Sequence, residues 1–158
     1  MQTDFSAGNA GPKVKADCLV TFVPGEGSLE VEIRGEADHA PLEQAVRMTA
    51  GRLGVAGKVT VEDAGAMPFV AAARFEAAAR KALGAGLPPL PPAVDHAASP
   101  KVRPRRSRLY LPGNRPDFLT KAVASGADGV ILDLEDSVAP DRKFEARILV
   151  AHALASMD

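Results

Sequence analysis

The strictest hydrophobic–polar pattern lies at residues 28–34, "SLEVEIR", where leucine, valine and isoleucine alternate with charged residues. A period of two predicts a strand with one buried face. Apolar runs at residues 18–24 and 58–63 predict two further strands. The glycines of "GEG" at residues 25–27 separate the first two runs, so we expect a β-hairpin there.

Two segments in the same half repeat with the helical period instead. Residues 38–55 carry an apolar stripe, a proline in the first turn and glycines at the end. Residues 69–83 follow another proline and are rich in alanine. Together with the strands, these helices predict a small α+β domain with an antiparallel sheet over residues 1–84.

The C-terminal third alternates strand and helix. Strand patterns at residues 108–113 and 128–136 are each followed by a helix pattern, at residues 115–126 and 139–157. This β-α-β-α order is typical of parallel strands joined by crossover helices. We therefore expect residues 107–158 to be the start of a barrel or doubly wound α/β domain. Because two strands do not make a stable parallel sheet, we also expect this part to need a partner, as in an oligomer.

Proline marks the segment between these two parts. Residues 85–106 hold six of the thirteen prolines and show no periodicity. Such a composition is typical of a semi-rigid linker. A ligand for an SH3-type domain is the alternative for this segment.

The composition narrows the class of protein. A length of 158 residues suits one domain or two small ones. The net charge of −1 gives no global field for nucleic acid or an anionic membrane surface, and no apolar run is long enough to span a bilayer. Cys18, the one cysteine, cannot form an internal disulfide, and the first residues have no signal-peptide pattern, so we expect a cytoplasmic protein.

Three acidic residues follow the apolar run of the second strand in the C-terminal third: Asp133, Glu135 and Asp136. In βα barrels, active sites lie at the carboxyl ends of the strands. An acid here can also cap the following helix, whose N-terminus favours negative charge, and we expect Asp136 or Ser137 to do so. Three acids exceed what a cap needs, but the spacing alone leaves a site and a solvated edge equally open.

Other polar residues give weaker signals. His39, His96 and His152 are scattered without the spacing of metal ligands, and we expect His39 and His96 to be solvated. Cys18 lies among apolar strand residues and is expected to be packed rather than reactive. The turns "GEG" and "PGN" lack the pattern of a phosphate-binding loop.

The C-terminal third resembles the N-terminal end of the citrate lyase β-chain family, which is also the HpcH/HpaI aldolase superfamily. The resemblance rests on "RS" at 106–107, "LYLPGN" at 109–114, Pro116, "GAD" at 126–128 and "DLEDSV" at 133–138. It implies that residues 107–158 form the first βαβα of a TIM barrel. Family members form or cleave carbon–carbon bonds beside a carbonyl, often on CoA or acyl-carrier thioesters, with Mg²⁺.

Residues 1–84 resemble the γ-chain of citrate lyase, its acyl carrier protein. The similarity runs through Asp17, Asp63, "GA" at 65–66, Arg74 and Glu76. In that family a serine in this first segment carries a phosphopantetheine-type arm. Here Lys15 stands in its place, and lysine has no hydroxyl to take the phosphodiester. We therefore expect no such arm on this chain.

The resemblance also assigns roles to residues of the C-terminal third. Asp133, Glu135 and Asp136 match the acidic strand end near the family's active site, where they would shape the surroundings of Mg²⁺ or water. Asp136 matches a catalytic histidine of the aldolase branch, which implies proton transfer. Arg115 and Lys143 could meet the phosphates of CoA or a carrier arm, although a solvated surface charge explains them equally well.

Two functions follow. The first is part of a citrate lyase-like carbon–carbon lyase of the oxo-acid-lyase type, acting on hydroxyacyl thioesters of CoA or a carrier. Because the family's substrate arginine and Mg²⁺ ligands lie on later strands, we expect this segment alone to be inactive and to contain no metal ligand. The alternative is a non-catalytic carrier or adaptor that docks onto citrate lyase-type α and β subunits.

Overall fold

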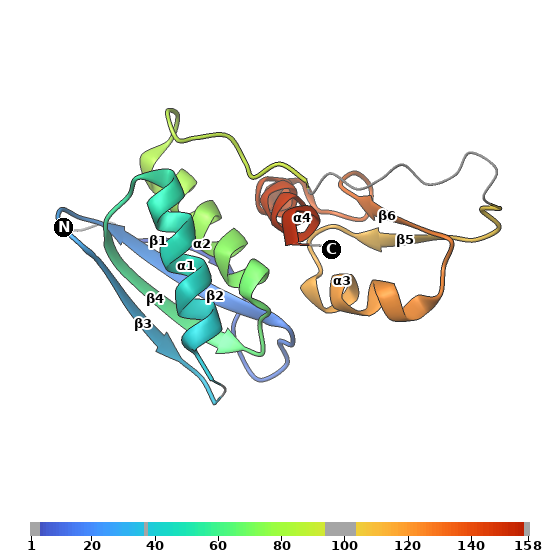
Figure 1. Ribbon diagram of the computed structural model, residues 1–158, viewed down its shortest axis with the longest axis horizontal. Coiled ribbons are helices and arrows are strands. Elements are labelled where there is room, and N and C mark those ends of the chain that lie inside the picture. Colours follow the sequence, from blue (N-terminus) through green and yellow to red (C-terminus); the bar gives the residue numbers. More distant parts are fainter. Residues whose placement is uncertain (1–3, 37, 94–103, 157–158) are drawn as a thin grey trace.

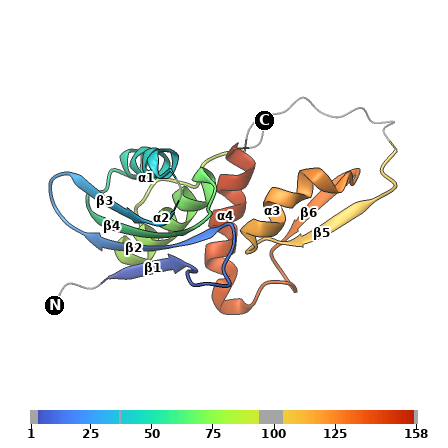
Figure 2. The same cartoon turned by 90° about the horizontal axis from the view of Figure 1, so that it is seen from below.

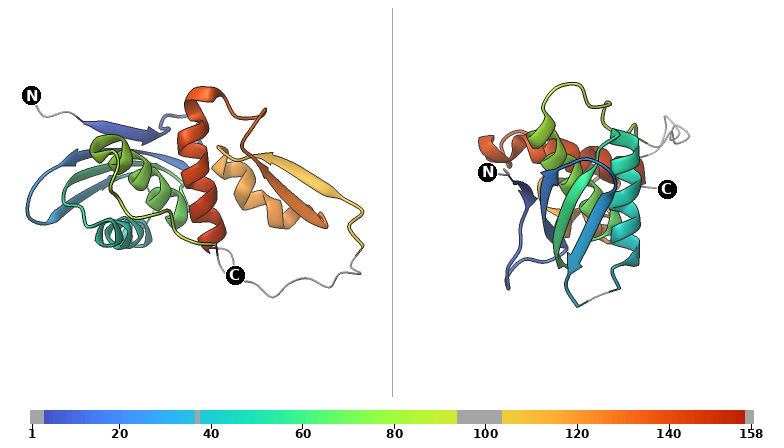
Figure 3. Two further views of the ribbon diagram at one scale, coloured as in Figure 1. Left: turned by 90° about the horizontal axis from the view of Figure 1, so that it is seen from above. Right: turned by 90° about the vertical axis from the view of Figure 1, so that its left-hand side faces the viewer.

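The computed structural model describes residues 4–36, 38–93 and 104–156. An N-terminal part (residues 4–93) and a C-terminal part (residues 104–156) lie end to end, as Figure 1 shows. The last helix, α4 (Lys143–Ser156), belongs to the C-terminal part by sequence but lies between the two, and the views in Figure 2 and Figure 3 agree on this.

The remaining elements follow the predicted order. They are β1 (Phe5–Gly8), β2 (Asp17–Pro24), β3 (Leu29–Arg34), α1 (Ala40–Leu53), β4 (Gly57–Ala64), α2 (Pro68–Leu83), β5 (Arg108–Pro112), α3 (Pro116–Ala122) and β6 (Gly129–Asp133), with short 3-10 turns at Val123–Ser125 and Pro140–Arg142. Every predicted strand and helix is present, with ends that differ by a few residues. Strand β1 was not predicted, because four residues are too short for a periodic signal.

The prediction of an antiparallel sheet with a β2–β3 hairpin is wrong. The strand order is β1-β2-β4-β3, with β2 antiparallel and β3 parallel to β4, so the sheet is mixed. The physical reason is the connection from β3 to β4, which runs through helix α1 and therefore brings the two strands side by side in the same direction. The "GEG" turn separates β2 from β3 without pairing them.

The core of the N-terminal part lies between this sheet and helices α1 and α2. Phe22 of β2 and Phe75 of α2 are fully buried and meet edge to face, with ring centroids 5.4 Å apart. Helix α2 is buried from Val70 to Ala79, on all sides rather than on one stripe. Its alanines allow this, because they let the sheet, α1 and α4 approach closely from different directions.

The C-terminal part holds a two-stranded parallel sheet, as its β-α-β order predicted. In its register Leu111 of β5 faces Leu132 of β6, and Pro112 faces Asp133, so both strands end at the same edge. Helix α4 leaves this sheet and packs on α2 instead, burying Leu149 and Ala153 completely in the core of the N-terminal part. The core therefore continues from one part into the other.

The described half of the proline-rich segment is seated on the N-terminal part. Arg80 donates a hydrogen bond to the carbonyl of Pro88, and Arg52 donates one of 2.8 Å to the carbonyl of Pro89. Leu87 and Leu90 pack against the core. Residues 85–93 thus follow helices α1 and α2 closely.

No helix among the described residues is both long and apolar enough to cross a bilayer.

Two glycines test the packing of this fold with one chemical change. Gly57, where β2, β3 and β4 meet, has φ of +137°, and an added Cβ would lie 2.2 Å from the carbonyl oxygen of Val23. Gly57→Ala should lower the free energy of unfolding by about 1–3 kcal/mol. Gly51, exposed on α1 with open space around it, is the control, since Gly51→Ala should raise that free energy by up to about 1 kcal/mol. Urea unfolding of both variants measures the difference, and a stable Gly57→Ala protein would contradict the packing described.

Candidate functional site

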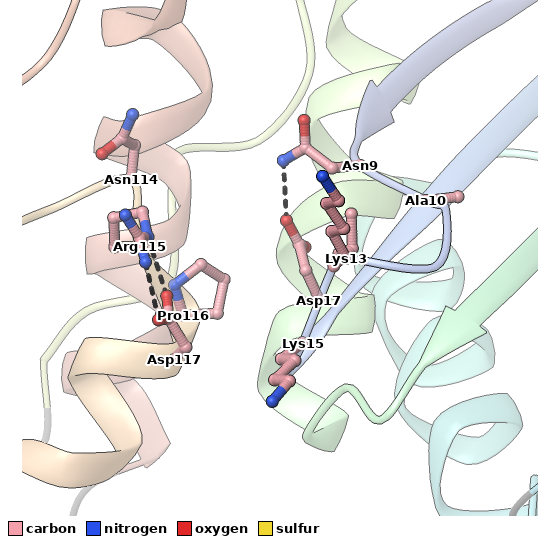
Figure 4. A pocket seen from close by; sticks show the side chains of 10 residues that line it. Asn9, Ala10, Lys13, Lys15, Asp17, Asn114, Arg115, Pro116 and Asp117 are labelled. Atoms are coloured by element: carbon pink, nitrogen blue, oxygen red, sulfur yellow. Dashed lines mark hydrogen bonds and ion pairs between the residues drawn. The ribbon is translucent and has the colours of Figure 1, made fainter.

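A pocket of about 440 Å³ opens where the two parts face each other. One wall is the loop between β1 and β2 together with the first residue of β2, residues 9–17, and the other is the turn after β5 together with the start of α3, residues 114–117. Figure 4 shows Lys13 and Lys15 on the first wall, opposite Arg115 and Asp117 on the second. We call this the interface pocket.

The first wall is fixed by short-range hydrogen bonds. Within the loop, the amide of Val14 donates to the carbonyl of Gly11 at 3.0 Å, which closes a turn. At its end, the amide of Ala16 donates to the carbonyl of Ala64 at 2.9 Å. Asn9 donates through its side-chain amide to Asp17 at 2.8 Å. The loop is thus tied to the sheet at both ends, with the two lysines between.

The charges on the two walls differ in how far they are neutralised. Arg115 binds both carboxylate oxygens of Asp117, at 2.8 and 2.7 Å, and its guanidinium lies 4.2 Å from the ring centre of Phe118. This pairing raises the pKa of Arg115 and lowers that of Asp117. Lys13 and Lys15 are exposed, and no hydrogen bond or ion pair holds either side chain among the residues described.

The acidic strand end is built as a hydrogen-bonded turn. Asp133 accepts hydrogen bonds from the amides of Glu135 and Ser137, at 2.8 and 3.0 Å. The Ser137 hydroxyl and these two amides lower the pKa of Asp133. Glu135 and Asp136 are exposed. The predicted cap by Asp136 or Ser137 is wrong, because the chain makes this turn and a 3-10 turn before α4 begins at Lys143.

The two predicted phosphate-binding residues are not brought together. Arg115 lines the interface pocket, whereas Lys143 donates to the carbonyls of Leu134 and Glu135, at 3.3 and 2.9 Å. Lys143 therefore holds the loop after β6 in place. Beside that loop, an added Cβ on Gly113 would lie 2.7 Å from Leu134, so the turn after β5 packs tightly against it.

The described residues alone do not fit a Mg²⁺ site. Nowhere in residues 4–36, 38–93 and 104–156 do three acidic, histidine or cysteine side chains gather closely enough to hold a metal ion. The carboxylates that line the interface pocket, Asp17 and Asp117, are each occupied by an arginine. Ligands from elsewhere would have to complete such a site.

Behind the first wall, Arg74 joins the two parts of the molecule. Its side chain, 1% exposed, forms a two-point ion pair with Asp17, with N–O distances of 2.9 and 3.0 Å. It also reaches Glu145 of α4 at 3.4 Å. Glu145 further binds Lys81 at 2.5 Å and accepts from the amide of Gly8 at 3.2 Å. Burial would raise the pKa of Glu145, but the hydrogen bonds from Lys81 and Gly8 and the charge of Arg142 outweigh it and lower the pKa.

A second buried charge, two residues further along α2, also has a partner on α4. Glu76 is fully buried, with Arg80 at 2.6 Å, His152 of α4 at 2.6 Å and Arg52 of α1 as partners. Burial would raise the pKa of Glu76, but the hydrogen bonds from His152 and Arg80 lower it overall. We call these two groups, centred on Arg74 and Glu76, the α2–α4 charge network.

The remaining sequence candidates give no site. His39 is half-buried, and its Nε2 atom is buried with no hydrogen-bond partner among the described residues, so the expectation that His39 is solvated is wrong for this atom. His96 lies outside the described residues. Cys18 is fully buried, as expected, and burial raises the pKa of its thiol, which keeps it unreactive.

Two protein families match this chain in separate segments. Residues 7–82 match the acyl-carrier family model described as "Malonate decarboxylase delta subunit (MdcD)". Residues 106–158 match the model described as "HpcH/HpaI aldolase/citrate lyase". The chain therefore joins an acyl-carrier-like segment to a segment of the citrate lyase-type aldolase family, which confirms both resemblances.

The curated relatives match in the C-terminal part. An L-malyl-CoA/beta-methylmalyl-CoA lyase of Cereibacter sphaeroides is 51% identical over 59 residues, which are 37% of this chain and 19% of the relative. A (3S)-malyl-CoA thioesterase of the same species is 45% identical over 58 residues, 37% of this chain and 20% of the relative. The chain thus spans about a fifth of the length of these relatives. No solved structure matches.

Several residues at these sites were not found by sequence reasoning. Asn114 and Asp117 line the pocket beside Arg115, and both lie in or next to the motif that carried the lyase resemblance. Lys13 lies two positions before Lys15, so spacing could have indicated it. Glu145 and His152 gave no usable signal, because their partners lie on α2, far away in the sequence.

Removing Arg74 tests the α2–α4 charge network. Arg74→Met keeps the length of the side chain but leaves Asp17 and Glu145 buried without their guanidinium partner. The free energy of unfolding should fall by about 3–5 kcal/mol. Arg34→Met removes an exposed pair with Glu32 and should leave the free energy of unfolding almost unchanged. Equal urea midpoints for the two variants would show that the buried pairs do not stabilise the fold.

The same network predicts how stability depends on pH. The pKa values of Glu76 and Glu145 lie below their ordinary value of 4.5 in the folded chain. Their ionised forms therefore stabilise the fold above about pH 4.5, and this contribution is lost as the pH falls through the folded pKa values. Urea unfolding between about pH 3 and pH 7 should show the loss. Glu145→Gln should flatten this acid limb, whereas Glu26→Gln, at an exposed turn, should leave it unchanged.

Proposed function

We propose that this chain supplies the N-terminal part of a carbon–carbon lyase that acts on hydroxyacyl-CoA thioesters of the malyl-CoA type. The observation that carries the proposal is the 51% identity over 59 residues to an enzyme named L-malyl-CoA/beta-methylmalyl-CoA lyase. The reaction would break the bond between the hydroxyl-bearing carbon and the carbon beside the thioester. The hydroxyl proton is lost, and the enolate that forms takes up a proton to give the shorter acyl-CoA.

The arrangement of the C-terminal part supports this proposal. Strands β5 and β6 run parallel and end at one edge, which is where βα barrels place their active sites. Asp133, Glu135 and Asp136 follow β6 at that edge, and the turn of Asn114 and Arg115 follows β5. A TIM barrel completed by further strands would place both loops at its mouth. Mg²⁺ held by ligands from those strands would polarise the thioester carbonyl.

Within such a mouth, the acidic residues have separate tasks. Asp133 accepts one backbone hydrogen bond on each carboxylate oxygen, so it fixes the loop that carries Glu135 and Asp136. The exposed carboxylates of Glu135 and Asp136 remain to face water or substrate, and Asp136 would transfer a proton. Lys143 holds the same loop from the other side through the carbonyls of Leu134 and Glu135.

The acyl-carrier-like segment would then be a fixed platform and carry no phosphopantetheine-type arm. Two features support this. Lys15 stands where the carrier family has its modified serine, and the α2–α4 charge network ties the segment to helix α4 through buried side chains. A fixed acyl-carrier-like segment would also suit the alternative function, an adaptor that docks onto lyase subunits. The boundaries proposed are 1–84, 85–106 and 107–158, with α4 crossing between the outer two.

The direct test is the product of the native gene, purified from its host and given L-malyl-CoA with Mg²⁺. A lyase releases glyoxylate and acetyl-CoA in equal amounts, detected as a phenylhydrazone and by chromatography. A thioesterase releases malate and free CoA, whose thiol reacts with Ellman's reagent. Release of free CoA without glyoxylate would replace the lyase proposal by a thioesterase. No turnover of either kind would leave the adaptor.

A chimaera tests this segment by itself. The 59 matched residues of the Cereibacter sphaeroides lyase are replaced by those of this chain, and malyl-CoA cleavage is measured. The chimaera should remain active, and Asp133→Asn within it should lower cleavage by about 10- to 100-fold, because one of the two backbone amides loses its acceptor. Asp141→Asn, at an exposed carboxylate nearby, is the matched control. A folded but inactive chimaera would refute the proposal.

A further inference from the structure

We propose that Lys13 and Lys15 form a phosphate subsite in the interface pocket, which binds the phosphate groups of a free CoA-type thioester. This inference rests on the proposed function, since it names how that substrate is held. Lys15 would then have a binding role of its own. It has no hydroxyl to which a carrier arm could be attached, but it supplies a positive charge. The ligand would then bind without a covalent arm.

The lining of the interface pocket carries an excess of positive charge. The interface pocket is lined by three cations and two anions: Lys13, Lys15, Arg115, Asp17 and Asp117. Asp117 is neutralised by Arg115, and Asp17 by Arg74 from behind the wall. Neither lysine has an ion-pair partner among the described residues, so the pocket keeps two uncompensated positive charges. Figure 4 draws the two ammonium groups at separate places along this wall, with that of Lys13 beside Asn9, so each can meet a different phosphate group of one ligand.

The interface pocket also has a shape that suits a ligand. The pocket has a volume of about 440 Å³ and two separate walls, as Figure 4 shows, so an anion can enter between the lysines and the Asn114–Asp117 turn. Asn114 adds an uncharged side-chain amide to the second wall. An elongated ligand can therefore be held from both sides. A flat basic surface would offer one side only.

Both walls of the interface pocket are held in place by the rest of the fold. Lys13 and Lys15 lie on a loop tied to the sheet through Asn9 and Ala16. The opposite wall follows β5 directly and is packed against the loop after β6. Arg74 binds Asp17 at the end of the lysine loop and Glu145 on α4. The same helix lies against the second wall, since an added Cβ on Gly113 would lie 3.0 Å from Val150, so α4 links the two walls. A preorganised site loses less entropy when it binds.

The interface pocket lies next to the ends of strands β5 and β6. The second wall begins at the carboxyl end of β5, in register with Asp133 at the end of β6. Phosphates held between the walls would leave the other end of an extended ligand beside these strand ends, where the proposed chemistry takes place. A phosphate subsite at this point therefore lies at the entrance of the proposed active site.

The test is binding to the 158-residue chain, measured by calorimetry at low ionic strength, with four probes. CoA and adenosine 3′,5′-bisphosphate carry phosphates on a nucleotide, pyrophosphate has phosphate alone, and pantetheine has none. CoA and pyrophosphate should bind, pantetheine should not, and binding should weaken as salt is added. Lys15→Gln and Lys13→Gln should each weaken CoA and pyrophosphate binding by about three- to tenfold.

Lys58→Gln is the matched control. It removes the same charge from an exposed lysine at the opposite end of β4 from the pocket, and binding should be unchanged. Equal effects of Lys58→Gln and Lys15→Gln would overturn the subsite, as would pantetheine binding as tightly as CoA. Binding of adenosine 3′,5′-bisphosphate but not pyrophosphate would also overturn it, since the nucleoside would then be recognised. Because no probe is cleaved, this outcome is independent of whether the native gene product is a lyase.

Discussion

Two buried charges on helix α2, Arg74 and Glu76, hold the molecule together. Each has partners in the N-terminal part and one on α4: Glu145 for Arg74 and His152 for Glu76. A buried ion pair is seldom more stabilising than a well-packed apolar pair, because both ions lose their hydration. Its effect is on specificity: α4 fits in this register, because a shift would separate Glu145 and His152 from their partners Arg74 and Glu76 on α2. The position of the C-terminal part follows from that register.

Periodicity was enough to find every helix and every strand except the short β1, but it did not show which strands are neighbours. The alternation at residues 28–34 predicted β3 and its buried face, yet the same pattern is compatible with a β2–β3 hairpin or with parallel pairing to β4. The crossover through α1 decided between them. Similarly, the alanines of α2 predicted a buried helix. Arg74 and Glu76 lie among them, and arginine and glutamate are residue types that are usually exposed. Their partners come from residues 145–152, and no local pattern encodes such a distant pairing.

The candidate sites were predictable to different degrees for the same reason. The acidic strand end was visible in the sequence because its three acids lie within four positions, and the structure adds that Asp133 accepts hydrogen bonds within the turn. Arg115 was identified through a motif, and its pairing with Asp117 is also local. The interface pocket could not be predicted, since residues 9–17 and 114–117 meet only when α4 is docked on α2.

The docking of α4 also bears on why Lys15 is compatible with a carrier-like fold. A mobile carrier works by a flexible tether, which raises the local concentration of its thioester at the active site without fixing its place. A segment held by buried charges cannot swing, so a covalent arm at residue 15 would gain little reach. Binding energy for a diffusing ligand has the opposite requirement, because it increases when the groups that bind are already in place. In the proposal made above, Lys15 at the position of the carrier serine and the buried contacts to α4 would favour the same outcome: a substrate that arrives free and is held by fixed charges.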